Sequence, residues 1–132
     1  METKALPAQP DVVAPDGSAV RILLELDRGA LAHFELPPGE TSLAVVHRSI
    51  DEIWYFLRGR GEMWRRLGER ESSVEVNAGI CLTIPVGTTF QFRSFGDEPL
   101  SALGATMPPW PGAGEARIVE GLWEPSVTPG PA

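Results

Sequence analysis

The sequence lacks several features that stabilise or localise small proteins. Its single cysteine, Cys81, permits no internal disulfide bond and no zinc site built from several thiolates. No stretch approaches the roughly 18 apolar residues of a membrane span. The first twenty residues contain Asp and Pro where a signal peptide requires an unbroken apolar run. We therefore expect no membrane partner and a cytoplasmic location.

Basic residues are also in the minority. The chain has 11 lysines and arginines against 18 aspartates and glutamates, a formal net charge of -7 at pH 7. A surface of that sign repels phosphate backbones and anionic lipid. We expect no nucleic-acid partner.

Helical periodicity is missing, and glycine and proline are abundant. The 132 residues include 14 glycines and 13 prolines, roughly a fifth of the chain against about 12% in average usage. This composition disfavours a helical bundle, and the length suits one domain with one core.

Short apolar runs with a two-residue period alternate with turn-rich clusters along the chain, which predicts an all-β fold, an antiparallel sandwich or barrel. The expected strands are 19–26, 30–36, 42–47, 52–57, 62–67, 73–76, 81–84, 89–94 and 100–107. We expect a single domain over 16–124, with disordered ends at 1–15 and 125–132. Within it, 108–124 reads as irregular but carries Trp110 and Trp123, so we expect it to pack on the domain.

The spacing of particular residues within these runs is informative. Gly39 is followed after five residues by Val45, after one more by His47, after four by Glu52 and after six by Gly59.

A second series follows. Gly79 is separated by five residues from Pro85, which is followed after one residue by Gly87, after two by Phe90 and after three by Ser94. Glycines at these points suit corners that need positive φ, and Pro-Val-Gly suits a tight turn.

Together the two series resemble the paired motifs of the cupin superfamily, over residues 39–94. The resemblance implies a cupin-type antiparallel β-barrel, also described as a jelly roll or double-stranded β-helix. It also implies a metal inside the barrel, held by two histidines and a glutamate of the first motif and a histidine of the second. Here those positions are Val45, His47, Glu52 and Phe90, and the final Asn of the family is Ser94.

Valine and phenylalanine donate nothing to a metal, and a catalytic site usually needs three protein ligands. We therefore predict no cofactor and no tightly bound metal; any metal that is held would use His47 and Glu52. The other histidine, His33, alternates with the apolar Ala32 and Phe34, so we expect it to face solvent or a partner chain.

Strand alternation also predicts what fills the barrel. If Glu52 points inward, Trp54 and Phe56 point inward with it, and so do Val45, Phe90 and Phe92 on other strands. The aromatic side chains are then either ordinary core or the walls of a binding cavity.

Burying His47 and Glu52 in such a cavity costs free energy, unless the two groups bond to each other or take part in chemistry. One interpretation is a His–Glu hydrogen bond that is purely structural. The other is proton transfer on a small planar or aromatic metabolite, with His47 as base and Glu52 fixing its tautomer and stabilising the imidazolium. Isomerase, lyase or cyclase chemistry fits that description. The alternatives are a small-molecule binding or sensor protein without catalysis, and a metalloenzyme with a reduced ligand set.

Four other features predict packing, burial, a turn and assembly. The proline-flanked Trp110 can pack outside the sheet, which we favour, or cap the barrel mouth over a ligand, or clasp a neighbouring subunit. Cys81 is expected to be a buried, inert thiol. Residues 58–61, RGRG, are expected to form a hairpin turn in a basic, solvated edge. The apolar run 20–26 predicts a homodimer through edge strands.

Overall fold

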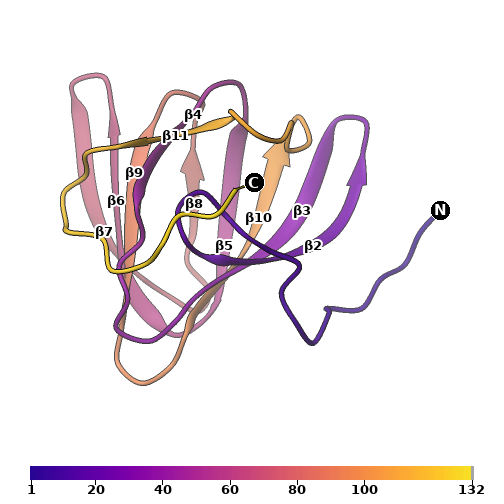
Figure 1. Ribbon diagram of the computed structural model, residues 1–132, viewed down its shortest axis with the longest axis horizontal. Coiled ribbons are helices and arrows are strands. Elements are labelled where there is room, and N and C mark those ends of the chain that lie inside the picture. Colours follow the sequence, from indigo (N-terminus) through magenta and orange to yellow (C-terminus); the bar gives the residue numbers. More distant parts are fainter. Residues whose placement is uncertain (132) are drawn as a thin grey trace.

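The computed structural model describes residues 1–131, which form two antiparallel sheets lying face to face (Figure 1). The six-stranded sheet runs in the order β1 (Val12–Val13), β2 (Ala19–Leu26), β3 (Gly29–Leu36), β10 (Leu100–Met107), β5 (Asp51–Arg58) and β8 (Cys81–Ile84). The five-stranded sheet runs in the order β11 (Ala116–Val119), β4 (Ala44–His47), β9 (Thr89–Phe95), β6 (Arg60–Leu67) and β7 (Arg70–Asn77). The predicted all-β antiparallel fold is confirmed as a sandwich-like jelly roll, since the sheets described here are not joined into a closed barrel.

The chain passes repeatedly from one sheet to the other, and glycines with positive φ lie at several of the corners. Gly59, with φ of 79°, joins β5 in one sheet to β6 in the other. A Cβ there would collide with the carbonyl oxygen of Pro99, so this corner requires glycine. The expected hairpin at 58–61 is therefore wrong, because the two strands it joins do not pair with each other.

The turn between β8 and β9 is a second corner, and it directs β9 between the sheets. In the predicted turn after β8, the backbone N–H of Thr88 donates to the carbonyl oxygen of Pro85 over 3.0 Å, and Gly87 has φ of 83°. The turn carries the chain from β8 to β9, so that Phe90 and Phe92 enter the space between the sheets.

The core lies between the two sheets, and alternation along β5 shows how it forms. Glu52, Trp54 and Phe56 are buried, whereas Ile53 and Tyr55 are 43% and 47% exposed. The inward parity predicted for this strand is confirmed. Aromatic side chains from both sheets meet there, namely Trp54 and Phe56 from one sheet and Phe90 and Phe92 from the other.

Two strands lie outside the predicted set. β1 pairs with the start of β2, and β11 pairs with β4, where Ala116 is opposite His47. The expectation that 108–124 is wholly irregular is therefore wrong. Both terminal segments have partners in the structure: Arg21 donates to the carbonyl oxygen of Pro7, and the N–H of Gly130 to that of Ala14. Disorder of 1–15 and 125–132 in solution stays a prediction, and residue 132 lies outside the described residues.

Two side-chain predictions are wrong. His33 does lie on the outer face of the six-stranded sheet, yet it is 5% exposed, because it stands opposite Arg21, which is bonded to the N-terminal segment. Burial, with the charge of Arg21, lowers the pKa of His33. Cys81 is exposed, because Leu82 and Ile84 take the inward positions of β8.

No helix among residues 1–131 is long and apolar enough to cross a membrane.

Candidate active site

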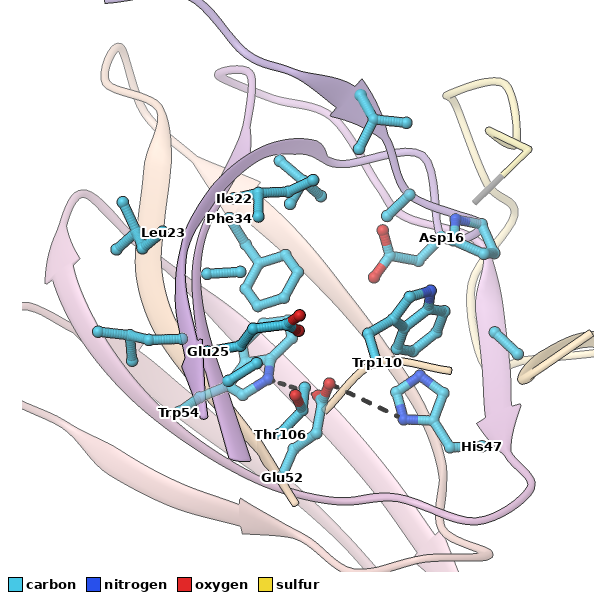
Figure 2. A pocket seen from close by; sticks show the side chains of 18 of the residues that line it. Asp16, Ile22, Leu23, Glu25, Phe34, His47, Glu52, Trp54, Thr106 and Trp110 are labelled. Carbon is cyan, nitrogen blue, oxygen red and sulfur yellow. Dashed lines mark hydrogen bonds and ion pairs between the residues drawn. The ribbon is translucent and has the colours of Figure 1, made fainter. Parts of the chain in front are cut away.

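A cavity of about 540 Å³ opens between the sheets, with the β2–β3 hairpin as one wall. Figure 2 shows its inner end, where His47, Glu52, Trp54 and Trp110 point toward one another. Six of the residues expected at a site line it, namely Val45, His47, Glu52, Trp54, Phe90 and Trp110.

Two further residues expected at the site do not line the cavity. Phe56 and Phe92 lie behind Trp54 in the core, with ring centroids 6.0 and 5.2 Å from its ring. They support the cavity wall without facing its space.

Several lining residues were not predicted from the sequence. Phe34 stacks on Trp54, with ring centroids 4.9 Å apart and planes 11° from parallel. Its place on the apolar face of its strand was a usable signal. Thr106, Asp16 and Glu25 also line the cavity, and nothing in the local sequence distinguishes them from ordinary polar residues.

His47 ends β4 and is held between two aromatic rings. The ring centroids of Phe90 and Trp110 each lie 5.3 Å from that of His47, both edge-on. Trp110 thus stands at the cavity, and the outside packing favoured for it from sequence is wrong. The Nδ1 atom of His47 is buried and has no hydrogen-bond partner within the described part of the chain.

Burial sets the charge of the imidazole. It lowers the pKa of His47 to about 4, against the opposing negative charge of Glu115. Glu115 is held in place by hydrogen bonds from the backbone N–H groups of Ser49 and Ile50. At neutral pH His47 is a neutral imidazole.

Glu52 is the second ionisable group at the inner end. Its Oε2 accepts a hydrogen bond of 2.7 Å from Nε1 of Trp54, and its Oε1 lies 4.0 Å from Nδ1 of His47. The pKa of Glu52 is raised to about 8, chiefly by burial. The hydrogen bond from Trp54 lowers this pKa, and the negative charges of Asp16 and Glu115 raise it. Near pH 7 Glu52 is mainly the protonated acid.

These charge states change the roles expected for His47 and Glu52. The 4.0 Å separation is too long for a hydrogen bond, so Glu52 does not fix the tautomer of His47 here. Two neutral groups do not form an ion pair either. The cavity instead places an uncharged proton acceptor beside an uncharged proton donor.

The metal implied by the sequence resemblance does not fit this donor set. Val45 and Phe90 are register partners on β4 and β9, both 1% exposed, and present only hydrocarbon at two of the four positions. No group of three or more His, Cys, Asp and Glu side chains placed to hold a metal ion occurs among residues 1–131. His47 and Glu52 alone are fewer than the three protein ligands usual for a catalytic metal.

The fold and the motif spacing together define the class. Residues 32–105 match the family model described as the cupin domain, more than half of the chain, and the protein belongs to the cupin family.

The chain is also similar to a curated protein and to several solved structures. The chain is 31% identical over 103 residues to the uncharacterized protein MJ1618 of Methanocaldococcus jannaschii, covering 74% of this chain and 79% of the relative. A similar solved structure is an uncharacterized conserved protein with a double-stranded β-helix domain from Klebsiella pneumoniae, at 18% identity and a TM-score of 0.65; the match covers 79% of this chain and 85% of that one.

Oxalate decarboxylase from Bacillus subtilis is also similar in fold, at 19% identity and a TM-score of 0.66. The match covers 76% of this chain and 28% of the decarboxylase. At these identities the two structures show a shared fold.

Proposed function

We propose that this cupin binds a small, planar metabolite in the cavity between its sheets and moves a proton within it, without a metal. The observation that supports this most is the pair at the inner end, where Nδ1 of His47 lies 4.0 Å from Oε1 of Glu52. One is a neutral acceptor and the other a protonated donor at the same pH. Pairs of titratable groups whose environments push their pKa values apart are typical of acid–base sites.

The surrounding side chains suit a flat molecule. The stacked rings of Phe34 and Trp54 form one wall, and the edges of Phe90 and Trp110 flank His47. A planar ligand against these rings gains apolar burial and offset stacking, which fixes its orientation relative to the acid and the base. Isomerisation, dehydration and cyclisation are the reaction types that such a pair can catalyse.

A second candidate is a binding or sensor protein that performs no chemistry. It is favoured by the pKa of His47, since a base with a pKa of about 4 is far from the value near 7 that serves general-base catalysis best. In that case the same cavity holds a ligand, and the two polar groups only orient it.

A further proposal concerns the location, the oligomeric state and the partners of the protein. We propose a cytoplasmic homodimer with a small-molecule ligand. We propose no nucleic-acid or membrane partner, because the net charge of -7 disfavours binding to phosphate backbones and anionic lipid. The decarboxylase in the comparison carries the name of a dianionic substrate. The described residues that line this cavity include no Lys or Arg to hold such an anion.

The test begins with a screen of small planar metabolites by thermal shift, since a ligand of the folded state stabilises it by mass action. For each binder, hydrogen–deuterium exchange at ligand carbons is followed by NMR. His47→Gln and Glu52→Gln should abolish exchange, while His33→Gln on the outer face and Glu75→Gln on β7 should not.

Binding without exchange at neutral or acidic pH would leave the sensor function and contradict catalysis. Binding that survives both cavity substitutions unchanged would place the ligand elsewhere and contradict both functions.

A further inference from the structure

Thr106 is a buried polar residue of the cavity with no assigned role. It is 4% exposed, lines the cavity, and its Oγ1 has no hydrogen-bond partner among the described residues. Nδ1 of His47 is in the same condition. Leaving a buried polar atom unsatisfied costs roughly 1–3 kcal/mol, and such atoms in native structures usually have a reason.

The sheet register places Thr106 next to the acid of the site. Thr106 on β10 is the direct register partner of Glu52 on β5, and both side chains face inward. Side chains opposite each other in an antiparallel pair have Cβ atoms about 4.5–5.5 Å apart. Figure 2 shows Thr106 beside Glu52, with His47 across the cavity floor from both.

We propose that Thr106 is a specificity-determining residue and that the ligand is an uncharged, planar carbonyl compound with an acidic C–H beside the carbonyl group. Its carbonyl oxygen accepts hydrogen bonds from the hydroxyl groups of Thr106 and Glu52. Its C–H faces Nδ1 of His47. This inference rests on the proposed function and names the substrate class for it.

The polar atoms of Thr106, Glu52 and His47 favour an uncharged carbonyl compound over other ligand classes. Two hydroxyl donors side by side match the two lone pairs of one carbonyl oxygen. A carboxylate ligand would meet no Lys or Arg among the described lining residues to balance its charge. A pure hydrocarbon would leave Thr106 and His47 unsatisfied. The acidic side chain of Glu25 is exposed and stands at the cavity wall, so a cationic ligand is the competing class.

The proton transfer balances without a further reactant. The C–H bond beside the carbonyl breaks and its proton goes to Nδ1 of His47, while Glu52 gives its proton to the carbonyl oxygen. The product is an enol, with an imidazolium and a carboxylate left on the protein. Where the ligand carries a C=C bond conjugated with the enol, the imidazolium proton returns to the far carbon of that system and the enol proton returns to Glu52, which shifts the double bond and restores both residues. Without such a bond the proton returns to the same carbon, and the ligand only exchanges it with solvent.

The binding test uses four probes of similar size and shape: acetophenone, ethylbenzene, benzoate and benzylammonium. Dissociation constants are measured by ligand-observed NMR at pH 7 on the whole chain. We expect acetophenone to bind best, about tenfold more tightly than ethylbenzene, as one or two buried hydrogen bonds would give. Tighter binding of benzoate or benzylammonium, or equal binding of acetophenone and ethylbenzene, would overturn the proposed class.

The role of Thr106 is tested with Thr106→Val, which removes the hydroxyl at constant shape, and Thr106→Ser, which keeps it. Thr106→Val should weaken acetophenone about tenfold and leave ethylbenzene unchanged, while Thr106→Ser should keep the preference for the ketone. Thr83→Val, at an exposed position of β8, is the control and should change neither. Loss of the preference in the serine variant, or its retention in the valine variant, would contradict the inference.

Failure of the inference is separable from failure of the proposed function. Deuterium exchange at the acetophenone methyl group reports proton transfer on its own. Ketone binding that depends on Thr106 but gives no exchange would contradict catalysis and keep the ligand class. Exchange that depends on His47 but not on Thr106 would keep the catalysis and overturn the inference.

Discussion

Val45 and Phe90 stand directly opposite each other in the β4–β9 ladder, both buried in the cavity wall. Each occupies a position where the family resemblance implies a histidine ligand. The pair therefore replaces half of the implied donor set with buried hydrocarbon.

This relationship leads to a prediction about metal content. Protein purified without a metal-affinity tag should carry well under one equivalent of transition metal, because two donors hold a catalytic metal poorly. Chelator should barely change its melting temperature, since no metal binding is coupled to folding. Elemental analysis after dialysis is the measurement, and stoichiometric Fe, Zn, Mn, Ni or Cu would contradict the metal-free proposal.

The matched variant restores the donors. Val45→His with Phe90→His should raise metal affinity markedly, because the two new imidazoles would lie beside His47 on the same sheet, with Glu52 on the opposite sheet. The control is a pair at positions outside the cavity, Ile53→His with Thr83→His, which should not create the same four-ligand site. An affinity equal to that of the control would mean that the cavity cannot close around an ion.

The family fold and nine of the eleven described strands could be predicted from sequence, because alternation and turn spacing are local signals. The missed strands had no such signal. β1 is two residues long, and Ala116–Val119 becomes a strand by pairing with β4, a contact that the local sequence does not show. The corner at Gly59 resembled a hairpin, because a glycine between two strands does not reveal whether they share a sheet.

At the site, parity predicted correctly that Val45, Glu52 and Trp54 are buried. It could not predict the electrostatics. The 4.0 Å gap between His47 and Glu52, and the charge states that follow from burial, depend on how the two sheets close over them. Thr106 escaped notice because its inward position becomes meaningful only beside Glu52.

The raised pKa of Glu52 predicts a pH dependence of stability. Its folded-state pKa is about 8 against an ordinary value of 4.5, so above pH 4.5 the folded protein keeps a proton that the unfolded chain releases. Stability therefore falls as pH rises toward 8. His47, with its pKa lowered from 6.5 to about 4, has the opposite effect, chiefly between those two values, and the lowered pKa of His33 acts in the same sense. The interval from pH 6.5 to 8 therefore favours Glu52, and a variant that does not titrate separates its effect from those of the histidines and of Asp16, whose pKa is also raised by burial.

Urea unfolding at pH 6.5 and 8.0 measures the effect. The wild-type chain should lose on the order of 1 kcal/mol over this interval. Glu52→Gln, which keeps the shape but does not titrate, should remove most of that loss, and the exposed Glu75→Gln should leave it in place. Equal losses in wild type and Glu52→Gln would show that burial does not raise the pKa of Glu52.

Phe90 and Phe92 provide a matched pair for separating core from binding wall. Phe92→Leu should cost roughly 1–3 kcal/mol of stability and leave ligand affinity unchanged, because Phe92 packs behind Trp54. Phe90→Leu should cost a similar amount and also weaken ligands severalfold, because Phe90 lines the cavity. Unfolding curves and dissociation constants for both variants check this, and an equal effect on affinity would remove the distinction.

The exposed apolar side chains of β2 predict self-association. Ile22 is 54% exposed and Leu26 83% exposed, and β1 pairs only with the other end of this strand, at Ala19 and Val20. We expect a dimer of the 14.3 kDa chain at micromolar concentration. Sedimentation equilibrium should show Ile22→Lys with Leu26→Lys shifting it to monomer, and Val86→Lys, on the β8–β9 turn, leaving it intact. A wild-type monomer would contradict the proposal.

The last prediction separates a structural His–Glu pair from a functional one. Replacing both residues by leucine, His47→Leu with Glu52→Leu, should leave the free energy of unfolding within about 1 kcal/mol of wild type or raise it, because buried polar pairs rarely outperform well-packed apolar ones. Nδ1 of His47 has no hydrogen bond to lose within the described residues. The bond from Nε1 of Trp54 to Glu52 is lost, and its cost of roughly 1–3 kcal/mol has to be offset by the apolar packing of the two leucines. The same variant should lose ketone binding and deuterium exchange. A folded, stable double variant that still binds and exchanges the ligand would move the site out of the cavity, whereas a large loss of stability would show that the pair holds the two sheets together.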